Sequence, residues 1–292
     1  MLAVEVLAGP GAQDVAVPLR QLDQSGLVTV TVAEQPGPVA LAIAVPGDHQ
    51  EHDDADVLLD GARPLDLQVG VLWAERIEPF AQEMAGLGRT KLGPAVLHDH
   101  DPRWLTAAQR MLDRLQKGLR ARGVDDGHWT YDHIGSTAVP GLQAKPFLDL
   151  QLGAVTVPGQ GSAADEVLAQ AGFLPATGSR PDSPGVYRDG IDDPNRAPAD
   201  VYRKRLYFRP DPGQYTILHV RKLGSPWQID TVVFRDWLRS VPAGRAAYEQ
   251  AKRNAAEAHA SDADFDDYTR AKGAFFRSAT WRHPLTAGEL TN

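Results

Sequence analysis

The chain of 292 residues is longer than one hydrophobic core usually organises, so we expect two domains. It contains no cysteine, which excludes disulfides, thiolate metal sites and cysteine nucleophiles. The net charge of −8 comes from residues 1–94, which hold 5 Lys and Arg against 14 Asp and Glu, whereas residues 95–292 hold 25 against 24. An acidic surface repels a phosphate backbone and therefore disfavours nucleic acid as a partner of the N-terminal third.

The sequence has no recognisable membrane or export signal. Its first residues lack the basic start of a signal peptide, and no apolar run approaches the roughly 20 residues that a membrane span needs. We therefore expect a soluble cytoplasmic protein without a membrane partner.

The first third of the sequence shows strand patterns followed by a helix pattern. Valine-rich runs at residues 4–8, 27–33 and 39–45 predict a small sheet. Apolar residues then recur at helical spacing from residue 65 to residue 87. Glycines and a proline around residues 88–94 mark a linker. We place the domain boundary there, with a small α/β segment over residues 1–92 and a second domain over residues 93–292.

Beyond the linker, Asp101 and Pro102 are typical of a helix start, and apolar residues follow on one face to about residue 123. Strands are predicted at residues 131–134 and 145–152, on either side of a tight loop. A helix near residues 165–171, strands at 205–208 and 215–221, and helices at 228–238, 243–259 and 262–280 complete the chain. This order predicts an α/β (α+β) fold, a mixed sheet with flanking helices.

The segment YDHIGSTAVPGLQAKPFLDLQL, residues 131–152, has the clearest chemical pattern. It combines the small-residue loop Gly135-Ser136 with Asp149 on the next predicted strand. A glycine lets the backbone approach a phosphate, a serine donates hydrogen bonds to it, and a carboxylate opposite can hold magnesium. A hairpin whose glycine serves only the turn has the same spacing, and spacing alone favours that simpler interpretation.

Several separate motifs in one order favour the functional interpretation. HIGSTAVPGL and AKPFLDL resemble the signature of the GrpB-like family, and DPRW, LHV, FRDWLR and YTRAK occur in the order that this family has them. The similarity covers nearly all of residues 95–282. The family is similar in fold to nucleotidyltransferases, in which a Gly-Ser loop binds the triphosphate and an Asp-x-Asp/Glu pattern with a third carboxylate holds two metal ions.

The resemblance implies a nucleotide or phosphorylated ligand at Gly135 and Ser136, with Asp149 as the catalytic and magnesium-binding acid. Lys145 and Lys272 match lysines of the motifs and are the implied phosphate partners. The second acid is absent, because Gln151 stands at its place. An amide lacks the charge that holds two divalent ions about 4 Å apart, which puts two-metal transfer in doubt and leaves a nucleotide with one Mg²⁺ ion open.

A histidine and a basic stretch could face the same site. His219 lies within a predicted strand and is a catalytic candidate without an assigned role, although a lone strand histidine is more often structural. Strand alternation points Arg205 to the same face as Arg203, and we retain Arg205 as a phosphate-binding candidate. Alternation leaves open whether Arg209 shares this face. The other basic residues of this region are interpreted as ordinary solvent-facing charges; they are Arg196, Lys204, Arg221 and Lys222.

The N-terminal third shows a second resemblance. ADVLLDGARPLDLQVGVLWAERIEPFAQ, residues 55–82, is similar to the C-terminal part of bacterial dephospho-CoA kinases, which in actinobacteria are fused to a GrpB-like domain in the same order. The phosphate loop G-x-x-x-x-G-K-[ST], whose lysine and N–H groups neutralise phosphates, is missing. Gly9-Pro10-Gly11 has no lysine near it. The segment is therefore interpreted as a degenerate relative without kinase activity.

The sequence leaves two functions open. The first is a nucleotidyltransferase-type protein that binds a nucleotide or phosphorylated ligand of unknown identity. The second is a non-catalytic accessory or interaction domain, such as a folding helper for the related kinase, which the missing second carboxylate favours. Sequence alone does not decide whether the chain is an enzyme.

Overall fold

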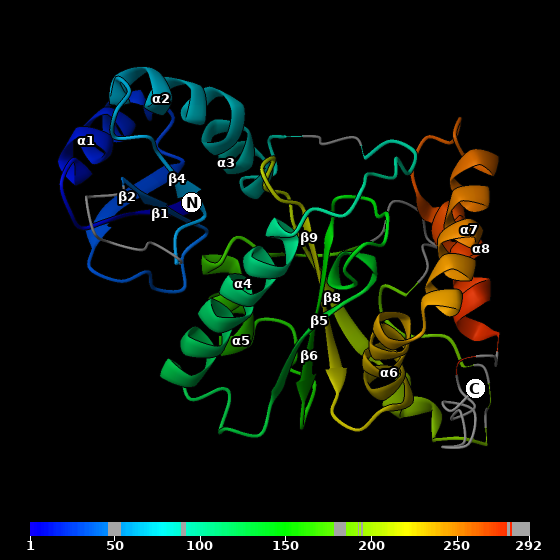
Figure 1. Cartoon of the computed structure of the whole chain (residues 1–292). Helices are drawn as coiled ribbons and strands as arrows, with labels where there is room; N and C mark the ends of the chain where they lie inside the picture. Colours follow the sequence, from blue (N-terminus) through cyan, green and yellow to red (C-terminus); the bar gives the residue numbers. More distant parts are fainter. Residues whose placement is uncertain are drawn as a thin grey trace.

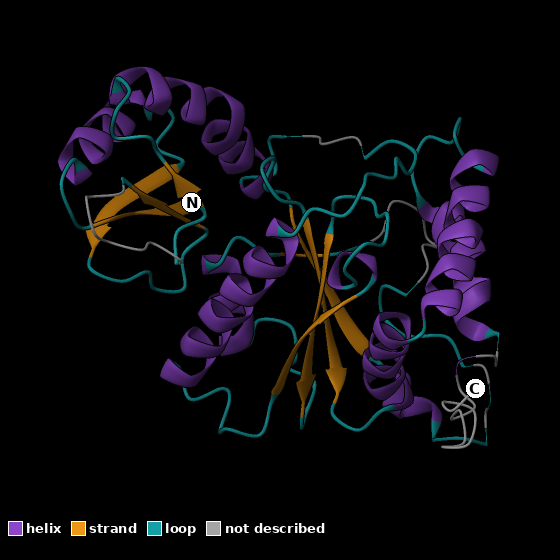
Figure 2. Cartoon of the chain, viewed as in Figure 1, coloured by secondary structure: helices purple, strands orange, loops and turns teal. Residues whose placement is uncertain are grey.

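A computed structural model describes residues 1–45, 54–88, 92–177, 185–191, 193, 195–278 and 281. Its strands form two sheets, one of four strands from the N-terminal third and one of five strands from the remainder (Figures 1 and 2). The fold is thus mixed α/β, as predicted. No helix within the described residues combines the length and hydropathy that crossing a bilayer requires.

Four parallel strands form the N-terminal sheet, in the order β2-β1-β3-β4. They are β1 (Leu2–Leu7), β2 (Val28–Ala33), β3 (Leu41–Ala44) and β4 (Val57–Leu58). Parallel neighbours need a crossover, which helix α1 (Ala12–Leu22) supplies between β1 and β2. Helix α2 (Leu65–Leu72), the π-helical turn η1 (Trp73–Ile77) and helix α3 (Glu78–Met84) follow one another without a break. Their apolar side chains pack with those of β1 and β3 into one core.

The second sheet is mixed, with the order β5-β6-β9-β8-β7. Only β6 and β9 are parallel, and the other neighbours are antiparallel. Its strands are β5 (Thr130–Ile134), β6 (Leu148–Ala154), β7 (Leu174–Pro175), β8 (Lys204–Arg209) and β9 (Thr216–Lys222). Helices α4 (Arg103–Ala121) and α5 (Ala163–Gln170) pack on one face. Helix α6 (Pro226–Ser240) covers the other face, with α7 (Pro242–Ala258) and α8 (Asp266–Arg277) on the same side of the sheet (Figure 1).

Strand alternation gives the second sheet one apolar and one polar face. Leu148, Leu150 and Leu152 of β6 point toward α4 and α5 and are fully buried there. The intervening residues of the central strands project from the opposite face; they are Asp149, Gln151, His219 and Arg221. Gln151 pairs with His219 and Gly153 with Arg221 in the β6–β9 register. Side chains of paired residues lie next to each other, so the polar residues gather at the centre of the sheet.

Buried charged side chains join the N-terminal sheet to the rest of the chain. Arg114 of α4 is buried and donates to Asp56 at 2.8 Å. Gly118 of the same helix lies so close to the N-terminal part that an added Cβ would be 2.8 Å from Pro38. Helix α4 therefore packs with one side on its own sheet and with another side on the N-terminal unit, as Figure 1 shows.

Candidate anion-binding site

The loop after β5 turns at Gly135 in a conformation that is essentially restricted to glycine. Its φ is 73° and its ψ is −169°, and Ser136 begins the short 3-10 turn η2 (Ser136–Ala138). A Cβ on Gly135 would lie 2.4 Å from Oδ2 of Asp149. The glycine is therefore what allows the Asp149 side chain to lie directly against the loop. Ser136 is fixed by a side-chain hydrogen bond with Tyr248 of α7.

Positive charge surrounds Asp149. Burial raises the pKa of Asp149, and Lys272, Lys145, Arg221 and Lys204 act in the opposite direction. These cations come from four different parts of the chain, namely α8, the segment before β6, β9 and β8. No hydrogen-bond donor within the described residues reaches the Asp149 carboxylate. Its oxygens consequently have unused acceptor capacity.

Two lysines next to Asp149 have no carboxylate within 4.0 Å among the residues that the structure describes. Nζ of Lys145 lies 3.1 Å from the ring centre of Phe265 and 4.0 Å from that of Phe147. Nζ of Lys272 lies 5.1 Å from the ring centre of Tyr268. Aromatic faces attract an ammonium group without neutralising it. Burial, followed by the charge of Lys272, holds the pKa of Lys145 well below its usual range, so an anion at this place would favour its protonation.

His219 is held as a neutral hydrogen-bond donor. Its Nδ1 lies 2.9 Å from Nζ of Lys204 and 3.2 Å from Nη2 of Arg221. Protonated lysine and arginine only donate, so Nδ1 accepts and the ring proton is on Nε2. Burial, followed by Lys204, Arg221 and Lys272, lowers the pKa of His219 well below its usual value. The imidazole is therefore neutral near neutral pH and offers an Nε2–H donor.

Asp189 anchors the two cations that face His219. Arg221 donates to its two carboxylate oxygens at 2.7 Å and 3.0 Å. Nζ of Lys204 lies 2.9 Å from Oδ1. Burial would raise the pKa of Asp189, but Arg221 and Lys204 outweigh it and hold the pKa at about 2. Burial also lowers the pKa of Lys204 to about 8, which leaves this side chain mainly protonated at neutral pH.

Gln151, at the place of the second acid, is fully buried and completely engaged. Its Oε1 accepts hydrogen bonds from Nη1 of Arg221 at 2.6 Å and from Thr231 at 2.9 Å. Its Nε2 donates to the Gln228 carbonyl at 3.0 Å. The amide thus connects β6 to α6 and positions an arginine, which is a different role from that of a metal-binding carboxylate.

The side chains around Asp149 do not fit a two-metal centre. The Asp149 carboxylate has no hydrogen-bond partner among the described residues. Four cationic side chains act on it. No group of three or more His, Asp and Glu suitable for a metal ion occurs in the described part of the chain. Divalent ions such as Mg²⁺ need several anionic or neutral oxygen ligands, so this arrangement favours an anion.

The structure brings most of the predicted site residues together. Gly135, Ser136, Lys145, Asp149, His219 and Lys272 lie in one cluster. Arg205 does not join them, because it points to the other face of the sheet and donates to Asp165 at 2.7 Å and to the Gly159 carbonyl at 2.8 Å. Sequence reasoning missed Lys204 and Arg221. The strand register could have indicated them, because Lys204 and Arg221 pair with each other and point to the same face of the sheet as His219.

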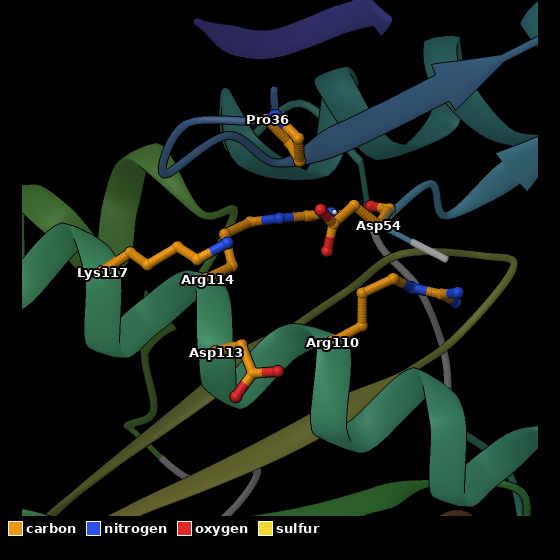
Figure 3. Close-up of a pocket in the computed structure, with 6 residues that line it drawn as sticks. All are labelled: Pro36, Asp54, Arg110, Asp113, Arg114 and Lys117. Atoms are coloured by element: carbon orange, nitrogen blue, oxygen red, sulfur yellow. Dashed lines mark hydrogen bonds between the residues drawn. The ribbon is translucent and has the colours of Figure 1, made fainter. Parts of the chain in front are cut away.

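A small pocket lies elsewhere, between α4 and the N-terminal unit (Figure 3). It is lined by Pro36, Asp54, Arg110, Asp113, Arg114 and Lys117. Its two arginines already face Asp56, with Arg114 at 2.8 Å and Arg110 at 3.7 Å. We interpret this pocket as part of the contact between the two sheets and not as the ligand site.

The protein is an α/β protein with a mixed sheet. Its candidate anion site consists of a glycine loop that lies against a strand carboxylate and is surrounded by lysines. The model of the GrpB protein family matches residues 94–282, and the chain belongs to this family. A UPF0157 protein from Streptomyces coelicolor is 32% identical over 176 residues, which cover 60% of this chain and 77% of that protein. The predicted resemblance to the GrpB-like family is therefore confirmed.

The similarity to dephospho-CoA kinases extends over both sheets. A protein named dephospho-CoA kinase from Mycolicibacterium paratuberculosis is 34% identical over 285 residues, covering 91% of this chain and 64% of that protein. The protein of the same name from Mycobacterium leprae is 33% identical, covering 85% and 60%. The chain thus spans less than two thirds of these relatives. The crystal structure of the conserved protein GrpB from Enterococcus faecalis has 18% identity and a TM-score of 0.41, covering 62% of this chain and 98% of that chain.

Proposed function

We propose that the chain binds a phosphorylated small molecule, such as a nucleotide, at this cluster. The observation that carries the proposal is the pair of ammonium groups of Lys145 and Lys272, which lie beside the Gly135 loop without a carboxylate within 4.0 Å in the described residues. Phosphate oxygens are strong acceptors with a double negative charge, and they suit ammonium groups and a glycine loop.

The charges of the cluster leave a surplus for an anion. The cations are Lys145, Lys272, Arg221 and Lys204, whereas the carboxylates that act on them are Asp149, Asp189 and Asp266. His219 is neutral. The surplus is one positive charge when Lys145 is protonated, which is the state that a bound anion favours. Solvent screens charges less in a partly buried site than on the surface, so this charge attracts a phosphate group effectively.

Binding, and not nucleotidyl transfer, is proposed because two-metal transfer uses three carboxylates as metal ligands, and Gln151 stands where the second of them would be needed. The charge of Lys272 acts on Lys145, Asp149, His219 and Lys252, so an anion bound at Lys272 would also change the electrostatic environment of these four residues.

Calorimetric titration of the full chain with ATP, GTP, CTP and dephospho-CoA tests the proposal. We expect Lys145→Met and Lys272→Met each to weaken binding by about 10- to 100-fold, because a hydrogen bond to a charged group contributes about 1.5–3 kcal/mol. Lys222→Met is the matched control, since Lys222 is exposed and lies on β9 but points away from His219. Absence of heat with all four ligands would contradict the proposal.

A non-catalytic accessory role is the second candidate, and the engaged amide of Gln151 favours it. In that role the polar face would serve the stability of the fold, and the chain would act through a protein partner such as a dephospho-CoA kinase. No heat from the four ligands, together with co-migration of the chain and the kinase in size-exclusion chromatography, would favour this candidate.

A further inference from the structure

We propose that the cluster binds its phosphorylated ligand without a divalent metal ion, and that Asp149 accepts a hydrogen bond from a hydroxyl group of the same ligand. This inference rests on the proposed function and names the ligand class. The ligand is an uncomplexed phosphate ester with a hydroxyl group nearby, as in a nucleoside monophosphate or a sugar phosphate.

The first reason is that the cluster consists almost entirely of donors. Lys145 and Lys272 present ammonium groups, and Nε2–H of His219 has no hydrogen-bond partner within the described residues. All three residues keep part of their surface exposed. A phosphate that already holds Mg²⁺ has less charge and fewer free lone pairs than an uncomplexed one, and it would match these donors less well.

The second reason is the position of Arg221. In a two-metal site, a second carboxylate would hold an ion beside Asp149. Here Oε1 of Gln151 is used by Arg221 and Thr231, and the guanidinium group supplies positive charge to Asp149 itself. A fixed cation therefore replaces the charge that a metal ion would bring, and a divalent ion at this place would be repelled by it.

The third reason is the unused acceptor capacity of Asp149. Its carboxylate receives no hydrogen bond from the described residues although Lys145 and Lys272 lie nearby. The Asp149 carboxylate and a ligand phosphate are both anionic and repel each other at close range. A group of the ligand that contacts Asp149 must therefore bring a proton that it can donate to the carboxylate. A ligand hydroxyl provides that proton, which makes a hydroxyl-bearing phosphate ester a better match than inorganic phosphate.

The test is titration of the full chain with AMP, once in EDTA and once with excess magnesium chloride. We expect the same affinity for AMP within about twofold under both conditions, because no protein-held metal contributes. For Asp149→Asn, whose amide oxygen still accepts a hydrogen bond, we expect the affinity for AMP to be the same in EDTA as in magnesium. Asp14→Asn, an exposed carboxylate on α1, is the matched control.

Two further comparisons test the individual contacts. His219→Gln keeps an N–H donor and is expected to retain binding, whereas His219→Leu is expected to weaken it by about tenfold. The 2′,3′-dideoxy analogue of AMP should bind about tenfold more weakly than AMP because the donor to Asp149 is missing. Equal affinity for the two compounds would overturn the assignment of the hydroxyl contact.

The outcomes separate this inference from the proposed function. Binding that requires magnesium and is lost in Asp149→Asn would overturn the metal-free inference and leave the proposed function in place. No binding of any phosphorylated ligand under either condition would overturn both. The comparison of EDTA with magnesium on the unmodified chain does not depend on the folding of any variant.

Discussion

Arg76 of the turn η1 forms a bidentate ion pair with Asp211, which lies 135 residues further along the chain. Nε of Arg76 is 2.8 Å from Oδ1 and Nη2 is 2.7 Å from Oδ2. The fully buried Asp211 also accepts a hydrogen bond from Arg209 at 2.5 Å. Asp211 lies in the turn between β8 and β9, the hairpin that carries Lys204 and His219. The N-terminal unit therefore supports the hairpin of the candidate site.

Removal of Asp211 is expected to cost more stability than removal of Arg76. Asp211→Ala leaves Arg209, which is 1% exposed, without its carboxylate, and we expect a loss of about 3–5 kcal/mol. Arg76→Ala leaves the Arg209–Asp211 pair intact and should cost about 1–3 kcal/mol. Urea denaturation measures both, with the exposed Arg63→Ala as a control that is expected to change little. Equal losses for the two buried variants would contradict this account.

The same ion pairs predict acid sensitivity. Burial opposes ionisation of Asp211, but Arg209 and Arg76 outweigh it and hold its pKa at about 2, below the ordinary value of 3.8. A carboxyl group with a depressed folded-state pKa stabilises the fold fully above its unfolded pKa, and this contribution is lost as the pH falls from about 4 toward 2. Asp211→Asn should show a shallower decrease in the free energy of unfolding over that range. A decrease as steep as that of the unmodified chain would assign the acid sensitivity to other groups.

Two glycines with similar φ values should respond differently to alanine. Gly135 and Gly141 have φ values of 73° and 75°, so both variants place a side chain at a positive φ, which costs about 1–3 kcal/mol. Only Gly135→Ala places a Cβ 2.4 Å from Asp149, whereas nothing lies within 4 Å of a Cβ at Gly141. We expect the larger decrease in melting temperature, and weaker ligand binding, for Gly135→Ala. Matching decreases would show that the contact with Asp149 relaxes without cost.

A carboxylate at position 151 is expected to destabilise the fold and not to create a metal site. Gln151→Glu replaces the Nε2 donor by an oxygen that would face the Gln228 carbonyl and lie close to Asp132, at a cost of about 1–3 kcal/mol. Gln13→Glu, at an exposed position of α1, controls for the added charge. Chemical denaturation with and without magnesium provides the measurement. Unchanged stability combined with magnesium-dependent stabilisation would refute this prediction.

Ligand binding should take up a proton at Lys145. Burial and the neighbouring Lys272 depress the pKa of Lys145 in the free protein, and a bound phosphate raises it again. Affinity should therefore fall as the pH rises, and the binding enthalpy at alkaline pH should differ between Tris and HEPES, whose ionisation enthalpies differ. Lys145→Met should remove this buffer dependence. Identical enthalpies in the two buffers for the unmodified chain would exclude proton uptake.

Local patterns were sufficient to predict most of the secondary structure. The helix expected after Asp101 is α4, and its apolar face, including Trp104, Met111 and Leu115, is buried as predicted. Helix α1 was not predicted, although Val15, Ala16 and Leu19 have helical spacing, because Pro18 at its centre removes a backbone donor and is typical of a break. The motifs around Gly135 and Asp149 also sufficed to assign the family.

Only the tertiary structure decided which charged residues meet. The sequence favoured Arg205 over its neighbour Lys204, but the register of β8 against β9 directs Lys204 toward His219 and Arg205 toward Asp165. Neighbouring residues of a strand point to opposite faces, so a choice between them depends on which face packs against which helices. Periodicity is a property of a short stretch of chain and can be read from it, whereas a contact such as Arg76–Asp211 exists only after two distant segments have packed together.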